Sequence, residues 1–160
     1  MIDDFPEIHP HRLMVAAHEV GHLVAWRIAG WTVTQVRLEG RGANTTGTTS
    51  IDRKQQFANL DHHRGYVVGL LAGIAAGERW CTDHNLSLAE HRSGCAVDLD
   101  VYRPARRDLQ NAGDERPTTS KLRADARGLV NTHWRLITRL AIRLAQRGSL
   151  DPTQVPTTTA

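Results

Sequence analysis

Apolar residues recur at the spacing of an α-helix in three stretches of the chain. The first, residues 10–29, begins with a proline that favours a first helical turn and is followed by Gly30, which favours a helix end. The second covers about residues 60–80, and the third about residues 120–147. The pattern therefore predicts three long helices, the last of which is expected to end at Gly148.

Glycine and proline residues modify this pattern. Three glycines recur every fourth residue in the second helix and predict that another element packs closely against it. They are Gly69, Gly73 and Gly77. A shorter helix is expected from Cys95, but Pro104 has no backbone N–H and predicts a break near residues 102–103. Segments 81–94 and 111–119 lack periodicity and are predicted to be a loop and a linker.

Between the first two helices the pattern is that of β-strands. In "TVTQVRLEG" apolar and polar residues alternate, and β-branched residues are frequent. A turn-rich segment follows, and a second short strand is predicted to end near Ile51. These elements predict a mainly helical α+β fold with a small β-sheet or hairpin. We expect one domain over residues 1–150 and a flexible tail over residues 151–160.

The composition is that of an ordinary globular protein. Hydrophobic residues make up 40% and charged residues 23% of the 160 residues, which suffices for the core of one domain. No apolar run approaches the roughly 20 residues of a membrane span, and the acidic N-terminus is unlike a signal peptide. Two cysteines, Cys81 and Cys95, are too few for a disulfide-rich secreted fold. We therefore expect a cytoplasmic protein without a membrane span and with buried thiols.

The net charge of +3 comes almost entirely from arginine. Six arginines recur at multiples of four residues on the last predicted helix, opposite its apolar face. They are Arg123, Arg127, Arg135, Arg139, Arg143 and Arg147. Such a strip is compatible with nucleic acid or an acidic partner, but a solvated helix face explains it more simply. Nucleic acid is therefore not the expected partner.

The most specific chemical signal is the segment "HEVGH" in the first predicted helix. His18 and His22 lie one helical turn apart, so both imidazoles can bind one zinc ion. Glu19 is not a ligand in this pattern, but it is close enough to act as general base on a zinc-activated water. The alternative, histidines that face solvent, fits the small and apolar neighbouring residues less well.

A catalytic zinc usually has three protein ligands and keeps one position for water. Six downstream side chains are candidates for the third ligand, and spacing alone leaves the choice open. They are Glu78, His84, Glu90, His91, Asp98 and Asp100. The remaining histidines have simpler explanations. His62 and His63 stand at a helix start and are expected to be exposed, as is His11 in a first turn.

Over most of its length the chain resembles the peptidase domain of the FtsH family, the membrane-anchored AAA zinc proteases. The likeness rests on segments that occur in the family's order: "HEVGHLVAW", "VTQVRLEG", "LLAGIAAGE", "SGCAVDL" and "SLDPTQV". The resemblance implies a zincin-like helix, a long C-terminal helix, and Asp98 as third ligand beside His18 and His22. It also implies hexameric rings, and a strand at residues 33–38 whose edge takes an extended peptide.

The chain departs from the family's pattern at several points. Beside Gly77, the family's acidic pair is reduced to Glu78, and Val97 stands where the family has an asparagine before the implied ligand. Pro104 falls where the family's helix continues. The sequence has no G-x-x-x-x-G-K-[ST] phosphate loop, so we expect no ATPase module, and a separate ATPase partner would have to deliver folded substrates.

We therefore expect a zinc metalloendopeptidase in which His18, His22 and Asp98 hold Zn²⁺ and Glu19 is the catalytic residue. It would hydrolyse peptide bonds of unfolded proteins or peptides. Two alternatives stay open. One is a zinc hydrolase of another substrate class, such as a deformylase, although that family's cysteine ligand precedes the helix and both cysteines here follow it. The other is a non-catalytic binding module with a basic helix face.

Overall fold

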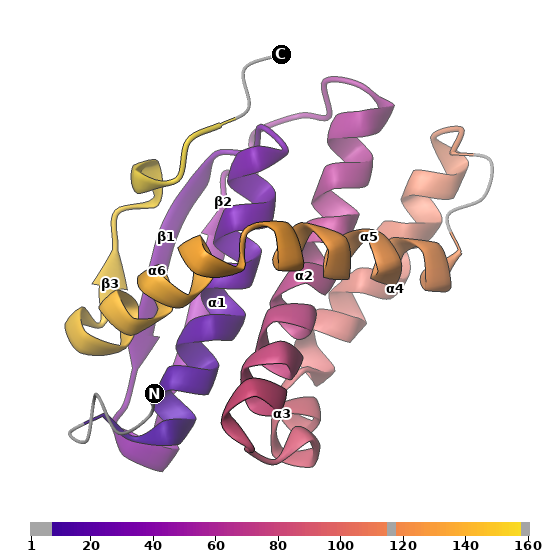
Figure 1. Cartoon of the computed structure of the whole chain (residues 1–160). Helices are drawn as coiled ribbons and strands as arrows, with labels where there is room; N and C mark the ends of the chain where they lie inside the picture. Colours follow the sequence, from indigo (N-terminus) through magenta and orange to yellow (C-terminus); the bar gives the residue numbers. More distant parts are fainter. Residues whose placement is uncertain (1–7, 115–117, 158–160) are drawn as a thin grey trace.

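The computed structural model describes residues 8–114 and 118–157. It is mainly helical with a small three-stranded antiparallel sheet, as predicted (Figure 1). None of the helices in these two ranges is long and apolar enough to cross a membrane. The elements in chain order are α1 (Pro10–Ile28), β1 (Val33–Glu39), η2 (Gly42–Asn44), β2 (Thr46–Ile51), α2 (Leu60–His84), α3 (Leu88–Gly94), α4 (Ala96–Asn111), α5 (Thr119–Thr132), α6 (Trp134–Arg147), β3 (Ser149–Leu150) and η3 (Pro152–Gln154).

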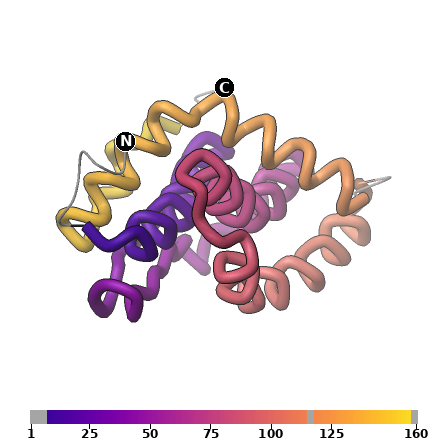
Figure 2. Tube along the Cα trace, turned by 60° about the horizontal axis from the view of Figure 1, so that its bottom comes forward, coloured from indigo at the N-terminus to yellow at the C-terminus, as the bar shows by residue number. Residues whose placement is uncertain are grey.

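Helix α1 lies at the centre of the fold. It runs antiparallel to α2, the sheet packs beside it, and α5 and α6 cross over both helices (Figure 1). Seen from another side, α5 and α6 form an arch over the central pair (Figure 2). Leu13, Val20, Leu23 and Val24 of α1 are at most 2% exposed. Burial of one such side chain contributes about 1.5–3 kcal/mol, so α1 is the main core element.

Strand β1 is the central strand of the sheet, whose order is β2-β1-β3. It pairs with β2 along the predicted hairpin and with β3 at Val36 and Arg37. The expectation that β1 offers an edge to an extended peptide is therefore wrong. Among the described residues, β2 has a neighbour on one side only. Strand β3 has only two residues, so it is too short to show the alternation of apolar and polar residues by which a strand is predicted.

The predicted loop at residues 81–94 is largely helical. Helix α2 continues to His84 and ends at Asn85, which adopts the left-handed conformation (φ 57°). Ser87 then caps α3. Only His91 is buried in α3, so this helix has no apolar periodicity that sequence reasoning could detect.

The predicted break before Pro104 does not occur, and α4 is one helix. Pro104 is exposed, so water can reach the carbonyl of Asp100 that would otherwise accept its N–H. Tyr102 and Ala105 are buried on either side and hold the helix to the core. Packing therefore outweighs the cost of the proline.

The last predicted helix is two helices, because His133 interrupts it (φ −105°, ψ 17°). This change of direction lets α5 pack on α2 while α6 packs on α1. Helix α6 ends at Gly148 as predicted, where φ is 80°.

The beginning of the predicted flexible tail is ordered. Residues 152–154 form η3, Val155 is fully buried, and Arg27 Nε donates a hydrogen bond to its carbonyl at 2.8 Å. Residues 158–160 lie outside the described residues. The linker predicted at 111–119 joins α4 to α5 as expected, although residues 115–117 are outside the description as well.

Candidate metal centre

Helices α1 and α4 bring three side chains to one point. The Nε2 atom of His18 lies 2.7 Å from Oδ2 of Asp98, and Nε2 of His22 lies 3.4 Å from the same oxygen. The two Nε2 atoms are 3.1 Å apart. The structure therefore brings Asp98, which stands 76 positions after His22, together with the histidine pair, as the family resemblance implied.

These three side chains fit a zinc ion. Ligand atoms bonded to tetrahedral zinc at about 2.0–2.1 Å lie about 3.3 Å from one another. The three observed separations of 2.7, 3.1 and 3.4 Å need only small adjustments to reach this spacing. Two imidazole nitrogens and one carboxylate oxygen are also a donor set that zinc accepts.

Helix α2 orients the second imidazole. Nδ1 of His22 lies 2.8 Å from the carbonyl oxygen of Gly69, to which an Nδ1–H donates, and this leaves Nε2 free to face Asp98. The helix can approach this closely because residue 73 is a glycine, and a Cβ there would collide with the ring of His22. The prediction that the α2 glycines allow close packing is confirmed.

His91 of α3 orients the first imidazole. Its Nε2 lies 3.0 Å from Nδ1 of His18, and its side chain is buried. Burial, followed by the interaction with neighbouring His18, lowers the pKa of His91 to about 4, so its neutral ring can accept the Nδ1–H of His18. Gly77 leaves the room for this ring, since a Cβ there would meet it. Sequence reasoning considered His91 only as a third ligand and missed this role.

A second group of possible ligands shares His18 and adds His91 and Cys95. All three of its side chains are buried, and neither His91 nor Cys95 lines the cleft that Glu19, His22 and Asp98 share. Burial, followed by the charge of Asp98, raises the pKa of Cys95 to about 12, which disfavours the thiolate that a metal requires. The group of His18, His22 and Asp98 is therefore the better candidate for a catalytic centre.

The charges at this centre depend strongly on one another. Burial lowers the pKa of His22, but the hydrogen bond to Asp98 and the charges of Asp98 and Glu19 together raise it to about 9. Burial raises the pKa of Asp98, yet its bonds to His18 and His22 hold it well below its usual range. Without a metal, His22 is therefore an imidazolium paired with the Asp98 carboxylate, and the imidazolium supplies positive charge at the candidate metal position.

Glu19 faces the same centre from α1. It is 8% exposed, and its Oε2 accepts a hydrogen bond from the Thr49 hydroxyl at 2.6 Å. Strand β2 lies close against it, because a Cβ on Gly47 would be 2.5 Å from Glu19 Cγ. A cleft of about 740 Å³ is lined by Glu19, His22, Asp98 and residues of β2. A substrate in this cleft would touch two of the proposed ligands, His22 and Asp98, together with the general base.

The other candidates for the third ligand lie elsewhere. Glu78 pairs with Arg92, and Asp100 pairs with Arg103 on the surface. The ring of His84 packs on Trp80, with ring centroids 4.2 Å apart. Glu90 is exposed in the first turn of α3. None of these residues belongs to a group of possible ligands within the described ranges.

Comparison with known proteins adds no identification. The chain matches no known protein-family model and no curated protein. The resemblance to the FtsH peptidase domain stays a hypothesis based on the quoted segments.

Proposed function

We propose that this protein is a zinc-dependent peptidase. The observation that carries the proposal is the convergence of His18, His22 and Asp98 on one point, at a cleft that Glu19 also lines. The hydrogen bonds to Gly69 and His91 support it, since partners that fix the tautomer of both imidazoles are typical of metal ligands.

In this proposal Zn²⁺ held by the three residues supplies a Lewis acid that polarises the scissile carbonyl and acidifies a water. Glu19 takes one proton from the attacking water as the oxygen bonds to the carbonyl carbon. It then gives that proton to the amide nitrogen as the C–N bond breaks. Thr49 keeps one oxygen of Glu19 in place, so the carboxylate reaches the reacting atoms with little freedom to rotate.

Strand β2 is the part of the fold best suited to hold a peptide. It lines the cleft from Gly47 to Ile51, and its outer edge is unpaired among the described residues. An extended chain can add to this edge through backbone hydrogen bonds, so unfolded segments and short peptides are the proposed substrates. Oligomerisation and a separate ATPase partner are further expectations from the FtsH resemblance.

The test measures bound zinc and cleavage of casein and of a fluorogenic peptide by the wild type and by Glu19→Gln. We expect both proteins to bind one zinc ion, and cleavage by the variant to fall by about 10²–10⁴-fold. Glu39→Gln, on the exposed end of β1, is the control and is expected to cleave normally.

Other outcomes would contradict the proposal. Unchanged cleavage by Glu19→Gln would remove Glu19 from the mechanism. A protein that takes up no zinc would favour the non-catalytic binding module. Hydrolysis of a formylated peptide at its formyl group, with casein intact, would favour a zinc hydrolase of another substrate class.

A further inference from the structure

A second pocket lies apart from the metal-site cleft. It measures about 320 Å³ and is bounded by α2, α5 and the adjoining ends of α3 and α4. The two hollows lie on different faces of α4, because Leu99 lines the pocket whereas Asp98 and Val101 line the cleft. The pocket and the cleft are therefore separate hollows.

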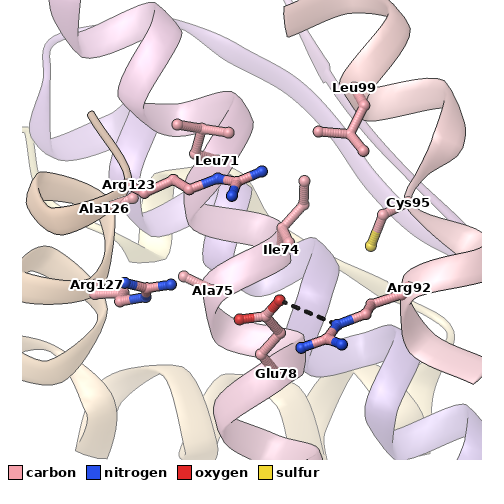
Figure 3. A pocket seen from close by; sticks show the side chains of 10 residues that line it. All are labelled: Leu71, Ile74, Ala75, Glu78, Arg92, Cys95, Leu99, Arg123, Ala126 and Arg127. Carbon is pink, nitrogen blue, oxygen red and sulfur yellow. Dashed lines mark ion pairs between the residues drawn. The ribbon is translucent and has the colours of Figure 1, made fainter. Parts of the chain in front are cut away.

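The floor of this pocket is apolar. Leu71 and Ala126 are buried, while Ile74, Ala75 and Leu99 are only partly buried and leave hydrocarbon surface accessible to water. Figure 3 shows Ile74 and Leu99 approaching one another from α2 and α4. An apolar ligand group placed there would remove this surface from water, at roughly 25 cal/mol for each Å² covered.

The walls of the pocket are basic. Arg92, Arg123 and Arg127 line it together with one acid, Glu78, which pairs with Arg92 at 3.8 Å. Arg123 and Arg127 extend from α5 over the floor (Figure 3). Neither guanidinium has an ion pair or hydrogen bond within residues 8–114 and 118–157. Two unpaired cations, one helical turn apart, thus border an apolar surface.

We propose that this pocket binds a small organic anion, namely a carboxylate or a phosphate monoester carried on a short apolar body. The planar forks of Arg123 and Arg127 match the oxygens of either anion. The apolar body covers Ile74 and Leu99, and the volume of about 320 Å³ is at the small end of the range for ligand pockets. This assigns Arg123 and Arg127 a role that a uniformly solvated arginine strip does not explain.

The test follows methyl NMR signals of the full chain during titration with hexanoate, hexyl phosphate, hexanol and hexylamine. We expect one or both anions to shift the methyl signals of Ile74, Leu99 and Ala75. Hexanol is expected to bind at least about tenfold more weakly, because it cannot accept a charge-assisted hydrogen bond from arginine. Hexylamine is expected not to bind detectably, because its positive charge is repelled by the two arginines. Hexanoate binding alone would identify a carboxylate pocket, and hexyl phosphate binding alone a phosphate pocket.

Two double variants separate local contacts from total charge. Arg123→Gln with Arg127→Gln should weaken anion binding by about tenfold or more. Arg135→Gln with Arg139→Gln removes the same charge from exposed positions of α6 and should leave binding unchanged. Equal binding of hexanol and hexanoate, equal losses in both double variants, or shifts confined to the metal-site cleft would overturn the proposal. Thermal unfolding of each variant verifies that it is folded.

Discussion

Two pairs of buried histidines show what distinguishes the candidate metal centre from an ordinary core. His18 and His22 are 8% and 3% exposed, and His62 and His63 are 9% and 5% exposed. The prediction that His62 and His63 are exposed is therefore wrong. Burial alone does not separate a ligand from a packing residue, and the difference lies in what the ring nitrogens face.

The rings of the second pair serve packing. His62 stacks on Trp31 with centroids 4.0 Å apart, and its Nδ1 accepts the backbone N–H of Ala58. His63 stacks on Phe57 with centroids 3.7 Å apart. Because the two are consecutive in a helix, they point in different directions. No carboxylate in the described residues hydrogen-bonds to either ring, so this pair lacks the convergence that unites His18, His22 and Asp98.

The largest difference between the two pairs is expected on removal of a ring. His22→Ala should abolish stoichiometric zinc binding, because it deletes a proposed ligand. His62→Ala should keep the zinc and lower the free energy of unfolding by about 1–3 kcal/mol, since it removes a buried stacked ring. Zinc analysis after gel filtration measures the first effect, and urea unfolding measures the second. Equal zinc loss in the two variants would mean that the metal depends on the fold and not on these ligands.

A pH titration of zinc affinity tests the charge state of the first pair. In the metal-free protein His22 holds a proton up to about pH 9, and zinc must displace it. The apparent affinity should therefore rise about tenfold per pH unit, or about 100-fold between pH 6 and pH 8. Competition with a chelator of known affinity measures it. A flat profile would show that His22 is neutral before zinc arrives.

The same raised pKa has the opposite effect on the stability of the metal-free fold. The pairing of the His22 imidazolium with Asp98 stabilises the folded state below pH 6.5 and is lost as the pH rises through about 9. Zinc binding and metal-free stability should thus change in opposite directions over this range.

A smaller effect on zinc affinity is expected from changes at His91. This residue does not line the substrate cleft and acts on the site through His18. His91→Leu removes the acceptor for the Nδ1–H of His18 and should weaken zinc binding by about 10–100-fold. His91→Gln keeps an acceptor and should recover part of the affinity, which a purely packing role would not predict. His84→Leu, which changes a histidine outside the centre, is the control. Unchanged affinity in His91→Leu would remove His91 from the site.

Periodicity predicted the parts of the molecule that bury a continuous face. The bounds of α1, the start of α2 and the β1–β2 hairpin follow from apolar spacing together with proline, glycine and turn signals. The pairing of His18 with His22 follows from helix geometry alone. Only the family resemblance selects Asp98 among the six candidates, because no local rule connects positions on two separate helices.

The remaining features depend on contacts between distant segments. Thr49 fixes Glu19 from a strand 30 residues away, and His91 reaches His18 from a helix with one buried residue. The break at His133 and the unbroken helix through Pro104 arise because packing on α1 and α2 outweighs local propensity. These outcomes require the three-dimensional arrangement of the core, which no local pattern encodes.

The smallest expected effect concerns His63, whose Nε2 is buried without a hydrogen-bond partner in the described residues. Burial lowers the pKa of His63, so the unfolded chain takes up its proton first as the pH falls below 6.5. Protonation of His63 therefore costs no stability above pH 6.5, and the free energy of unfolding declines as the pH falls below that value. Between about pH 7.5 and pH 5.5 the free energy of unfolding should decrease less in His63→Leu than in the wild type. The two decreases should differ by less than about 1 kcal/mol. Urea unfolding at both pH values, with the metal removed, measures the difference. Parallel pH profiles would indicate that His63 is protonated within the fold, and its burial would then need a carboxylate partner of the kind that Asp98 provides to His22.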